Sequence, residues 1–259
     1  MKLIVKSTFL ILVVIIVGFS SCTSYKQMIY LQNVDSSSAE NFFPKVQPEY
    51  KIQSQDILFI RILTLNRDVS DLINSTPTST SNLYNNEASM YIFGYNVSDS
   101  GYVELPVLGK VYVAGKTLDG AKEALSKQAA VYLKDATVIV KLISFKYSVF
   151  GEVMRPGVFY NYNNQLTVLE AISEAGNLTD YANRKKVLVI RPTPKGTKTF
   201  RLDLTNKNIL SSDGFYLLPN DMVYIEPIKS KTFRLNLPTI SLFLTSVSTL
   251  ILILNYLNK

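Results

Sequence analysis

Five acidic residues have the clearest potential for chemistry in this sequence: Asp56, Glu104, Glu152, Glu170 and Asp221. General acid–base catalysis needs two such groups held close together with different pKa values. No spacing in the sequence pairs these carboxylates, and ordinary turns and helix caps account for most of them. The chain has no histidine and one cysteine, which excludes histidine-based catalysis, thiolate zinc sites and intramolecular disulfides. We therefore predict that the protein is not an enzyme and uses no cofactor or metal.

The positive net charge of +7 raises the question of a nucleic-acid partner. The basic residues are scattered, apart from one cluster at Arg184-Lys185-Lys186. Nucleic-acid binding requires a basic face on a known binding module, and no such module is recognisable. We predict a solvated surface and no nucleic-acid partner.

The single cysteine follows a targeting segment. Lys2 and Lys6 precede an apolar run over residues 9–19, as in a secretory signal peptide. The run ends at Phe19-Ser20-Ser21-Cys22, which is similar to a bacterial lipoprotein cleavage box with Phe in place of the usual Leu. This predicts a signal peptide at 1–21, lipid on Cys22 and a location in the Gram-negative cell envelope. The alternative is an uncleaved signal anchor with an ordinary cysteine.

A second apolar segment lies near the C-terminus. Residues 239–257 carry no charge and would form a helix of roughly 28 Å, close to the thickness of a bilayer core. Pro238 suits a first helical turn. We therefore predict a linker over residues 229–238 and a transmembrane helix over residues 239–257.

Small polar residues share about one third of the circumference of this predicted helix: Ser241, Thr245, Ser248, Thr249 and Asn255. Such a face permits close packing of membrane helices. It would also suit the wall of a neutral pore for a sugar polymer, although Leu252 interrupts it. One span cannot enclose a pore, so this interpretation requires a closed cyclic oligomer. The alternative is a plain anchor whose hydroxyl groups bond local carbonyls.

The soluble part of the chain has the patterns of two α+β units. In the second, residues 148–153 and 158–160 predict a hairpin, and residues 187–191, 199–204 and 217–225 predict further strands. Thr167 and Glu170 form a capping box before a short helix that ends at Gly176. A hairpin followed by a short helix is a β-grasp-like opening. Residues 177–184 are interpreted as a loop.

The first unit has strand patterns around residues 57–62, 91–97, 102–105, 107–113 and 137–142. Thr117 caps a predicted helix that runs to about Tyr132. The polar stretch over residues 66–89 is interpreted as a flexible excursion. The segment 22–47, with its Asp-Ser-Ser-Ser run at 35–38, is interpreted as a tether that lets the body stand off the lipid surface.

Three motifs in the first unit resemble the periplasmic domain of the outer-membrane polysaccharide export family. They are Tyr-x-Ile-x-x-x-Asp-x-Leu-x-Ile from Tyr50 to Ile60, Gly-x-x-x-Leu-Pro-x-Leu-Gly from Gly101 to Gly109, and Gly-x-Thr from Gly115. The second unit resembles the soluble-ligand-binding β-grasp (SLBB) domain that follows it. Gln55 stands where the family often has glycine, and the chain has room for one SLBB domain where members can carry more.

The resemblance implies an outer-membrane transporter of capsular polysaccharide or exopolysaccharide with periplasmic domains. It also implies an octameric ring, C-terminal helices that form the pore, and an inner-membrane polysaccharide co-polymerase, often a tyrosine autokinase, as partner. The alternative is a periplasmic glycan-binding or adaptor lipoprotein of an assembly whose channel is another protein.

Four residues of the second unit are candidate glycan contacts, because they offer stacking surfaces and hydrogen bonds: Tyr160, Tyr162, Tyr181 and Arg184. They have an alternative role in packing neighbouring subunits or facing water. The full prediction is an α+β chain with six segments. These are a signal peptide at 1–21, a tether at 22–47, an export domain at 48–145, an SLBB domain at 146–228, a linker at 229–238 and a transmembrane helix at 239–257.

Overall fold

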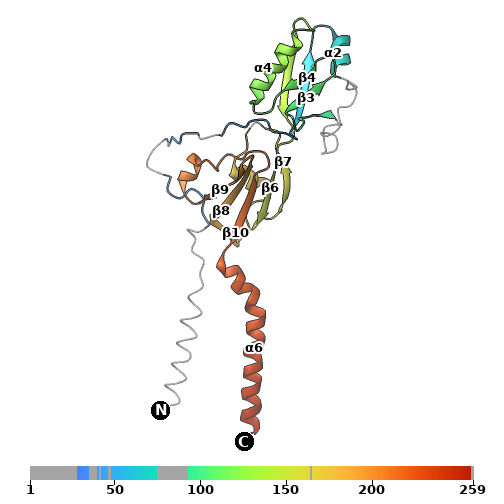
Figure 1. Cartoon of the computed structure of the whole chain (residues 1–259). Coiled ribbons are helices and arrows are strands. Elements are labelled where there is room, and N and C mark those ends of the chain that lie inside the picture. Colours follow the sequence, from blue (N-terminus) through green and yellow to red (C-terminus); the bar gives the residue numbers. More distant parts are fainter. Residues whose placement is uncertain are drawn as a thin grey trace.

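The computed structural model describes residues 28–34, 40, 42–45, 48–74, 93–163 and 165–257. The predicted signal peptide and Cys22 lie outside these residues. The described part contains two α+β domains, as predicted, and a long C-terminal helix, α6 (Lys229–Leu257). Figure 1 shows the first domain at one end, the second domain in the middle, and α6 projecting from the opposite side of the second domain.

The first domain is built around strand β1, which pairs with an antiparallel neighbour on each side in the order β2-β1-β5. Strands β3 and β4 form a separate hairpin, and alternate residues of these strands enter one buried core with α4. Thr117 caps α4 as predicted. The elements are β1 (Ile57–Leu63), α2 (Arg67–Asn74), β2 (Tyr95–Asn96), β3 (Tyr102–Leu105), β4 (Gly109–Tyr112), α4 (Leu118–Ala129) and β5 (Thr137–Leu142).

Helix α2 corrects the prediction that residues 66–89 are a flexible excursion, at least over residues 67–74. Its first turn is capped by the Asn66 side chain, which accepts a hydrogen bond from the Asp68 amide at 3.0 Å. At its other end Asn74 exchanges two hydrogen bonds with the backbone of Ile62 in β1. Ile73 is buried in the core. Asn66 and Asn74, residue types that are typical of loops, therefore cap helix α2 and bind it to strand β1.

The second domain contains a five-stranded sheet in the order β7-β6-β10-β8-β9. Strands β6 and β10 are parallel neighbours, and the other pairs are antiparallel. Helix α5 covers one face, and its capping box between Thr167 and Glu170 is present as predicted. The elements are β6 (Lys146–Gly151), β7 (Gly157–Tyr160), α5 (Val168–Glu174), β8 (Ala182–Thr193), β9 (Gly196–Leu202), η2 (Lys207–Ser211) and β10 (Met222–Pro227).

The tether prediction is wrong for the described residues of that segment. The amides of Leu31 and Gln32 donate hydrogen bonds to the carbonyls of Leu204 and Thr205 at 3.1 and 2.8 Å. Tyr30 and Leu31 pack against the core of the second domain. Further along, Lys45 donates to Gln165 at 2.7 Å. Apolar side chains among polar ones fasten this stretch to the protein, so we call residues 28–34 the N-terminal strap.

Two boundaries near the C-terminal helix also differ from the prediction. Strand β8 begins at Ala182, inside the predicted loop 177–184, because it pairs with the end of β10. The predicted linker 229–238 is helical, and α6 passes through Pro238. Proline has no backbone N–H, so it cannot donate the hydrogen bond to the preceding turn of the helix. Side-chain contacts with the second domain stabilise the turns before Pro238.

Candidate functional site at the junction of the second domain and helix α6

The first turn of α6 is fastened to the second domain by an ion pair. Lys231 Nζ donates a hydrogen bond to Glu152 Oε1, and Thr179 Oγ1 donates to Glu152 Oε2 at 2.7 Å. Glu152 is buried, with 7% of its surface exposed. It follows directly after β6, so the ion pair connects the end of an inner strand of the sheet to the helix.

A second contact lies one turn further along the helix. Arg234 Nη1 donates a hydrogen bond to the Tyr181 hydroxyl, and the guanidinium carbon lies 5.8 Å from the centre of the tyrosine ring. The Ile228 amide donates to the Tyr181 carbonyl at 2.8 Å. Together these contacts define a neck of Glu152, Thr179, Tyr181, Lys231 and Arg234, which fixes how α6 leaves the domain.

The contacts of the neck with Glu152 depend on the ionisation of its carboxyl group. Burial alone would raise the pKa of this carboxyl group, but hydrogen bonds from Lys231 and Thr179, and the Lys231 charge, outweigh burial and hold the pKa below its ordinary value of 4.5. A carboxylate whose folded-state pKa is lowered stabilises the fold above the unfolded pKa. This contribution is lost as the pH falls through the folded pKa.

We expect Glu152→Gln to lower the stability of the full-length, detergent-solubilised protein by about 1 kcal/mol at pH 7. The difference from the parent protein should shrink as the pH falls below about 4.5, because the parent carboxylate then becomes protonated. Thermal unfolding from pH 7 to pH 3 measures both quantities. A difference that stays constant over this range would show that the Glu152 charge does not stabilise the neck.

The surface of α6 is apolar and uncovered. Residues 229–253 form the one helix, among the described residues, with the length and composition to cross a membrane, and its apolar window is not buried by the rest of the protein. The large side chains Phe243, Leu244, Leu250 and Leu252 are more than half exposed. Unlike a core helix, α6 therefore presents its apolar surface to its surroundings.

The small polar residues of α6 bond to their own helix. Ser241 donates to the Pro238 carbonyl at 2.8 Å, and Thr245 to the Ser241 carbonyl. Ser248 and Thr249 both donate to the Thr245 carbonyl at 2.8 Å. The side chain of Asn255 lies outside the described residues. Each hydroxyl oxygen keeps the capacity to accept a hydrogen bond, so pore lining and helix packing by this face stay predictions.

The structure does not bring the four candidate glycan contacts together, and their contact with glycan stays a prediction. Tyr160 pairs with Lys146 at the start of β6, whereas Tyr181 and Arg184 lie where β8 pairs with the end of β10. Because β6 and β10 run parallel, these are opposite ends of the sheet. Tyr181 is occupied by Arg234, and Arg184 lies over the Tyr30 ring of the N-terminal strap. Tyr162 is 66% exposed, and its contact with glycan stays a prediction.

The first sequence motif closes a structural turn around Asp56. This buried carboxylate accepts hydrogen bonds from the Tyr50 hydroxyl at 2.7 Å and from the Gln53 amide at 2.8 Å. Burial raises the pKa of Asp56, and these bonds partly oppose the effect. Gln55 has φ 70°, the left-handed conformation that glycine adopts most easily. Gln55 therefore stands where the family often has glycine, but its backbone adopts the conformation that a glycine would adopt there.

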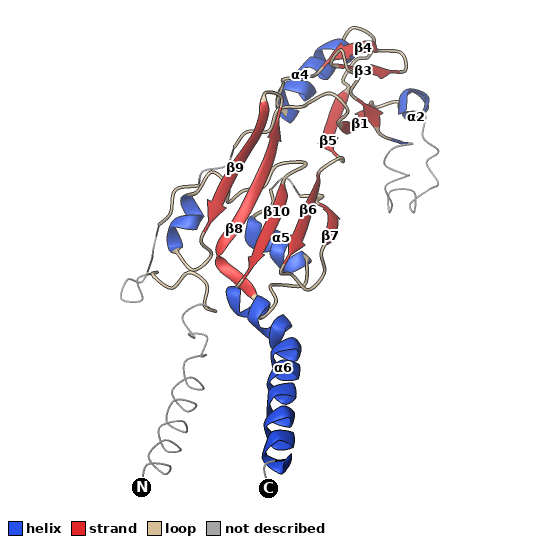
Figure 2. Ribbon diagram, turned by 60° about the horizontal axis from the view of Figure 1, so that its bottom comes forward, coloured by secondary structure: helices blue, strands red, loops and turns tan. Residues whose placement is uncertain are grey.

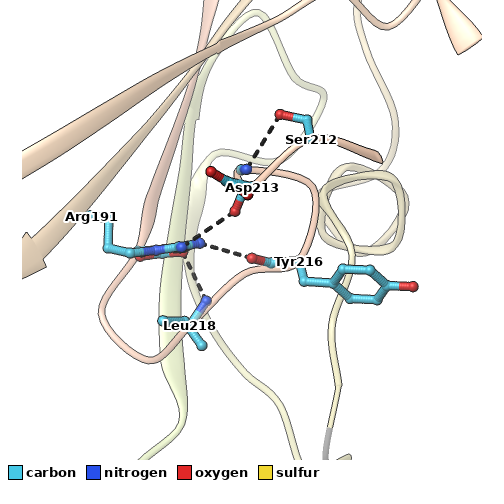
Figure 3. Close-up of polar contacts among 7 residues, drawn as sticks. Arg191, Ser212, Asp213, Tyr216 and Leu218 are labelled. Carbon is cyan, nitrogen blue, oxygen red and sulfur yellow. Dashed lines mark hydrogen bonds and ion pairs between the residues drawn. The ribbon is translucent and has the colours of Figure 1, made fainter. Parts of the chain in front are cut away.

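A buried ion pair that the sequence did not reveal stabilises the end of the second domain. Figure 3 shows the surroundings of its arginine, Arg191, including the contact with Tyr216. Arg191 binds Asp221 through Nε to Oδ1 at 3.0 Å and through Nη2 to Oδ2 at 2.8 Å. Arg191 Nη2 also donates to the Tyr216 carbonyl, and the Leu218 amide donates to Asp221, both at 2.8 Å. Asp221 is fully buried. Its partner Arg191 lies near the end of β8, 30 positions away in the sequence, so spacing along the chain gave no signal for the pair.

Comparison with known proteins matches both domains. Residues 44–143 match the polysaccharide biosynthesis/export protein family, and residues 145–225 match the SLBB domain. The chain is 31% identical over 136 residues to the EPS I polysaccharide export outer membrane protein EpsA of Ralstonia nicotianae. It is 29% identical over 154 residues to the protein of the same name from Ralstonia solanacearum. The matches cover 50% and 57% of this chain, but only 35% and 39% of these relatives.

The two matches define a class of protein in which an export domain precedes one SLBB domain, in agreement with the fold. The chain is similar to the polysaccharide export family over its first domain and to the SLBB domain over its second. The matched stretch spans little more than a third of the length of these curated relatives.

Proposed function

We propose that this chain is an outer-membrane component of capsular polysaccharide or exopolysaccharide export. Its export and SLBB domains lie in the periplasm, lipid on Cys22 attaches it to the outer membrane, and α6 crosses that same membrane. The proposal contains no catalytic step. It is supported by the similarity of the two domains to the export family and the SLBB domain, and by the exposed apolar surface of α6.

The docked N-terminal strap is the observation that carries the proposal. Tyr30 Oη donates to Asn177 at 3.1 Å, and its ring faces Arg184, so the strap lies at the end of the SLBB domain from which α6 leaves. Only seven residue steps separate Cys22 from Ile29, and they can span at most about 25 Å. A lipid on Cys22 and the start of α6 would therefore reach the same bilayer.

A pore requires several copies of α6. A helix satisfies its own backbone hydrogen bonds and can cross a bilayer singly, whereas a channel needs a closed ring of subunits. We propose an octameric ring in which the face with Ser241, Thr245, Ser248, Thr249 and Asn255 lines or packs the exit. The export domains, at the far end from α6, would face an inner-membrane polysaccharide co-polymerase or tyrosine autokinase.

A second candidate function is a periplasmic adaptor or glycan-binding lipoprotein whose channel is made by another protein. The hydroxyl groups that bond to their own helix favour it, because a plain anchor needs only this arrangement. The adaptor would be a monomer or small oligomer that does not conduct ions in a bilayer. A high-mass ring after detergent extraction, with conductance, would count against it.

The first test of the proposed function is the location of the C-terminus. A cysteine placed at Lys259 should react with a membrane-impermeant maleimide on intact cells, because α6 would carry it across the outer membrane. Reaction only after the outer membrane is permeabilised would support the adaptor instead.

A further inference from the structure

Basic residues surround the point where α6 leaves the SLBB domain. Strand β8 pairs with β10, which leads into α6, and the lower ends of both strands lie at the top of the helix (Figure 2). Six cations from β8 and the first turns of α6 are therefore close to the neck, and we call them the basic collar: Arg184, Lys185, Lys186, Lys229, Lys231 and Arg234.

An irregularity in the sheet exposes the β8 part of the collar. Val187 pairs with Ile225 and Ala182 pairs with Pro227, so five residue steps on β8 face two on β10. The extra residues leave the regular ladder, as in a β-bulge. Lys185 and Lys186 are exposed as a result. The basic cluster at residues 184–186, predicted from the sequence to be solvated surface, thus lies at the neck.

Carboxylates balance only part of this charge. Glu152 is bound by Lys231, and Glu226 is shared by Lys186 at 3.9 Å and Arg201 at 3.1 Å. Asp180, next to Tyr181, is exposed. Asp203 precedes Leu204, whose amide donates to the Arg184 carbonyl at 2.8 Å, and the Asp203 side chain accepts hydrogen bonds from Thr205.

Three members of the collar keep unused binding capacity. Lys185 and Lys229 have no ion-pair partner in the described part of the chain. Arg184 Nε is buried without a hydrogen-bond partner there.

The helix itself adds positive potential at the same place. An α-helix carries a partial positive charge at its N-terminus, where acidic residues are stabilising. The first turn of α6 has none and contains Lys229 and Lys231 instead. Lys229 lies six residues before Leu235, which is 69% exposed, and this corresponds to about 9 Å along the helix. The lysine would therefore lie in the headgroup layer once the apolar surface is in the bilayer core.

We propose that the basic collar binds the phosphates of anionic phospholipid headgroups in the leaflet that faces the SLBB domain. This inference rests on the proposed insertion of α6 in a membrane. Each lysine near an anionic membrane surface favours binding independently of the apolar helix. The lipid phosphates supply the negative charge that the nearby carboxylates do not. The collar then fixes the height at which the SLBB domain stands above the bilayer.

The test uses the full-length protein reconstituted in nanodiscs of phosphatidylcholine with a minor fraction of phosphatidylglycerol. The readout is the ratio of the two lipids retained after detergent re-extraction, compared with the ratio supplied. The test variant is Lys185→Gln/Lys229→Gln, which leaves the ion pairs of the neck intact. The matched control is Lys122→Gln/Lys127→Gln, with the same change in charge on exposed positions of α4.

The parent protein and the control should both enrich phosphatidylglycerol. The test variant should lose about fivefold of this preference for each lysine removed. Equal enrichment by test variant and control, or no enrichment by the parent, would overturn the collar while leaving membrane insertion intact. A parent protein that does not stay in the nanodisc would overturn the insertion of α6, and the collar with it.

Discussion

Replacing Arg191 with methionine is expected to lower the free energy of unfolding by about 3–5 kcal/mol, the usual cost of removing one partner of a buried ion pair. Asp221 would stay buried without its cation, and the Tyr216 carbonyl would lose a donor. Methionine keeps much of the side-chain volume, so the loss reports on charge and hydrogen bonds more than on packing. Thermal or denaturant unfolding of the full-length protein measures it.

Arg201→Met is the matched control for this prediction. Arg201 pairs with Glu226 at 3.1 Å, but its side chain is 68% exposed. An exposed ion pair contributes at most about 1 kcal/mol, because water and salt screen it. The account therefore predicts a large loss for one arginine and a small one for the other. Similar losses in the free energy of unfolding for the two variants would show that the buried Arg191–Asp221 pair stabilises the SLBB domain no more than an exposed ion pair does.

Deleting residues 239–259 is expected to abolish surface polysaccharide. The deletion keeps Lys231 and Arg234, so the contacts of the neck with Glu152 and Tyr181 remain. The two soluble domains have separate buried cores and should stay folded and attached to lipid. Surface polysaccharide is measured on whole cells, and the amount of membrane-attached protein is measured alongside it. Normal surface polysaccharide with the truncated chain present would contradict the role of α6.

Substitutions in α6 distinguish a helix that lines a pore from a helix that only anchors the protein. Replacing Ser241, Thr245, Ser248 and Thr249 with alanine keeps an apolar helix of the same length and removes the hydroxyl face. A pore or packing role predicts reduced export at normal protein level. A plain anchor predicts unchanged export, because a helix with alanine at these positions is still apolar and still satisfies its own backbone hydrogen bonds in the membrane.

Local features of the fold were predictable from sequence. The capping box at Thr167 and Glu170 depends on residues three apart, and the β6–β7 hairpin on one turn containing Pro156 and Gly157. Such signals are read directly from neighbouring residues. They led to the two domains, and through their motifs to the family.

Contacts between distant residues were not predictable. Lys231 and Glu152 are 79 positions apart, and Arg191 and Asp221 are 30 apart. The positions of the candidate glycan contacts relative to one another were not predictable for the same reason, since the parallel pairing of β6 with β10 separates Tyr160 from Tyr181. The strap and α2 were misread because polar residues there bond to the folded domains rather than to water. Local composition does not distinguish these two situations.

The central claim is that α6 crosses the outer membrane, and labelling of Lys259→Cys tests it most directly. With Cys22 acylated, the introduced thiol would be the only free one. Lys122→Cys, on the exposed surface of α4, is the matched control and should react only after permeabilisation of the outer membrane. The account predicts that the cysteine at 259 reacts with an impermeant maleimide on intact cells. Reaction of both positions only after permeabilisation would contradict it and favour the adaptor function.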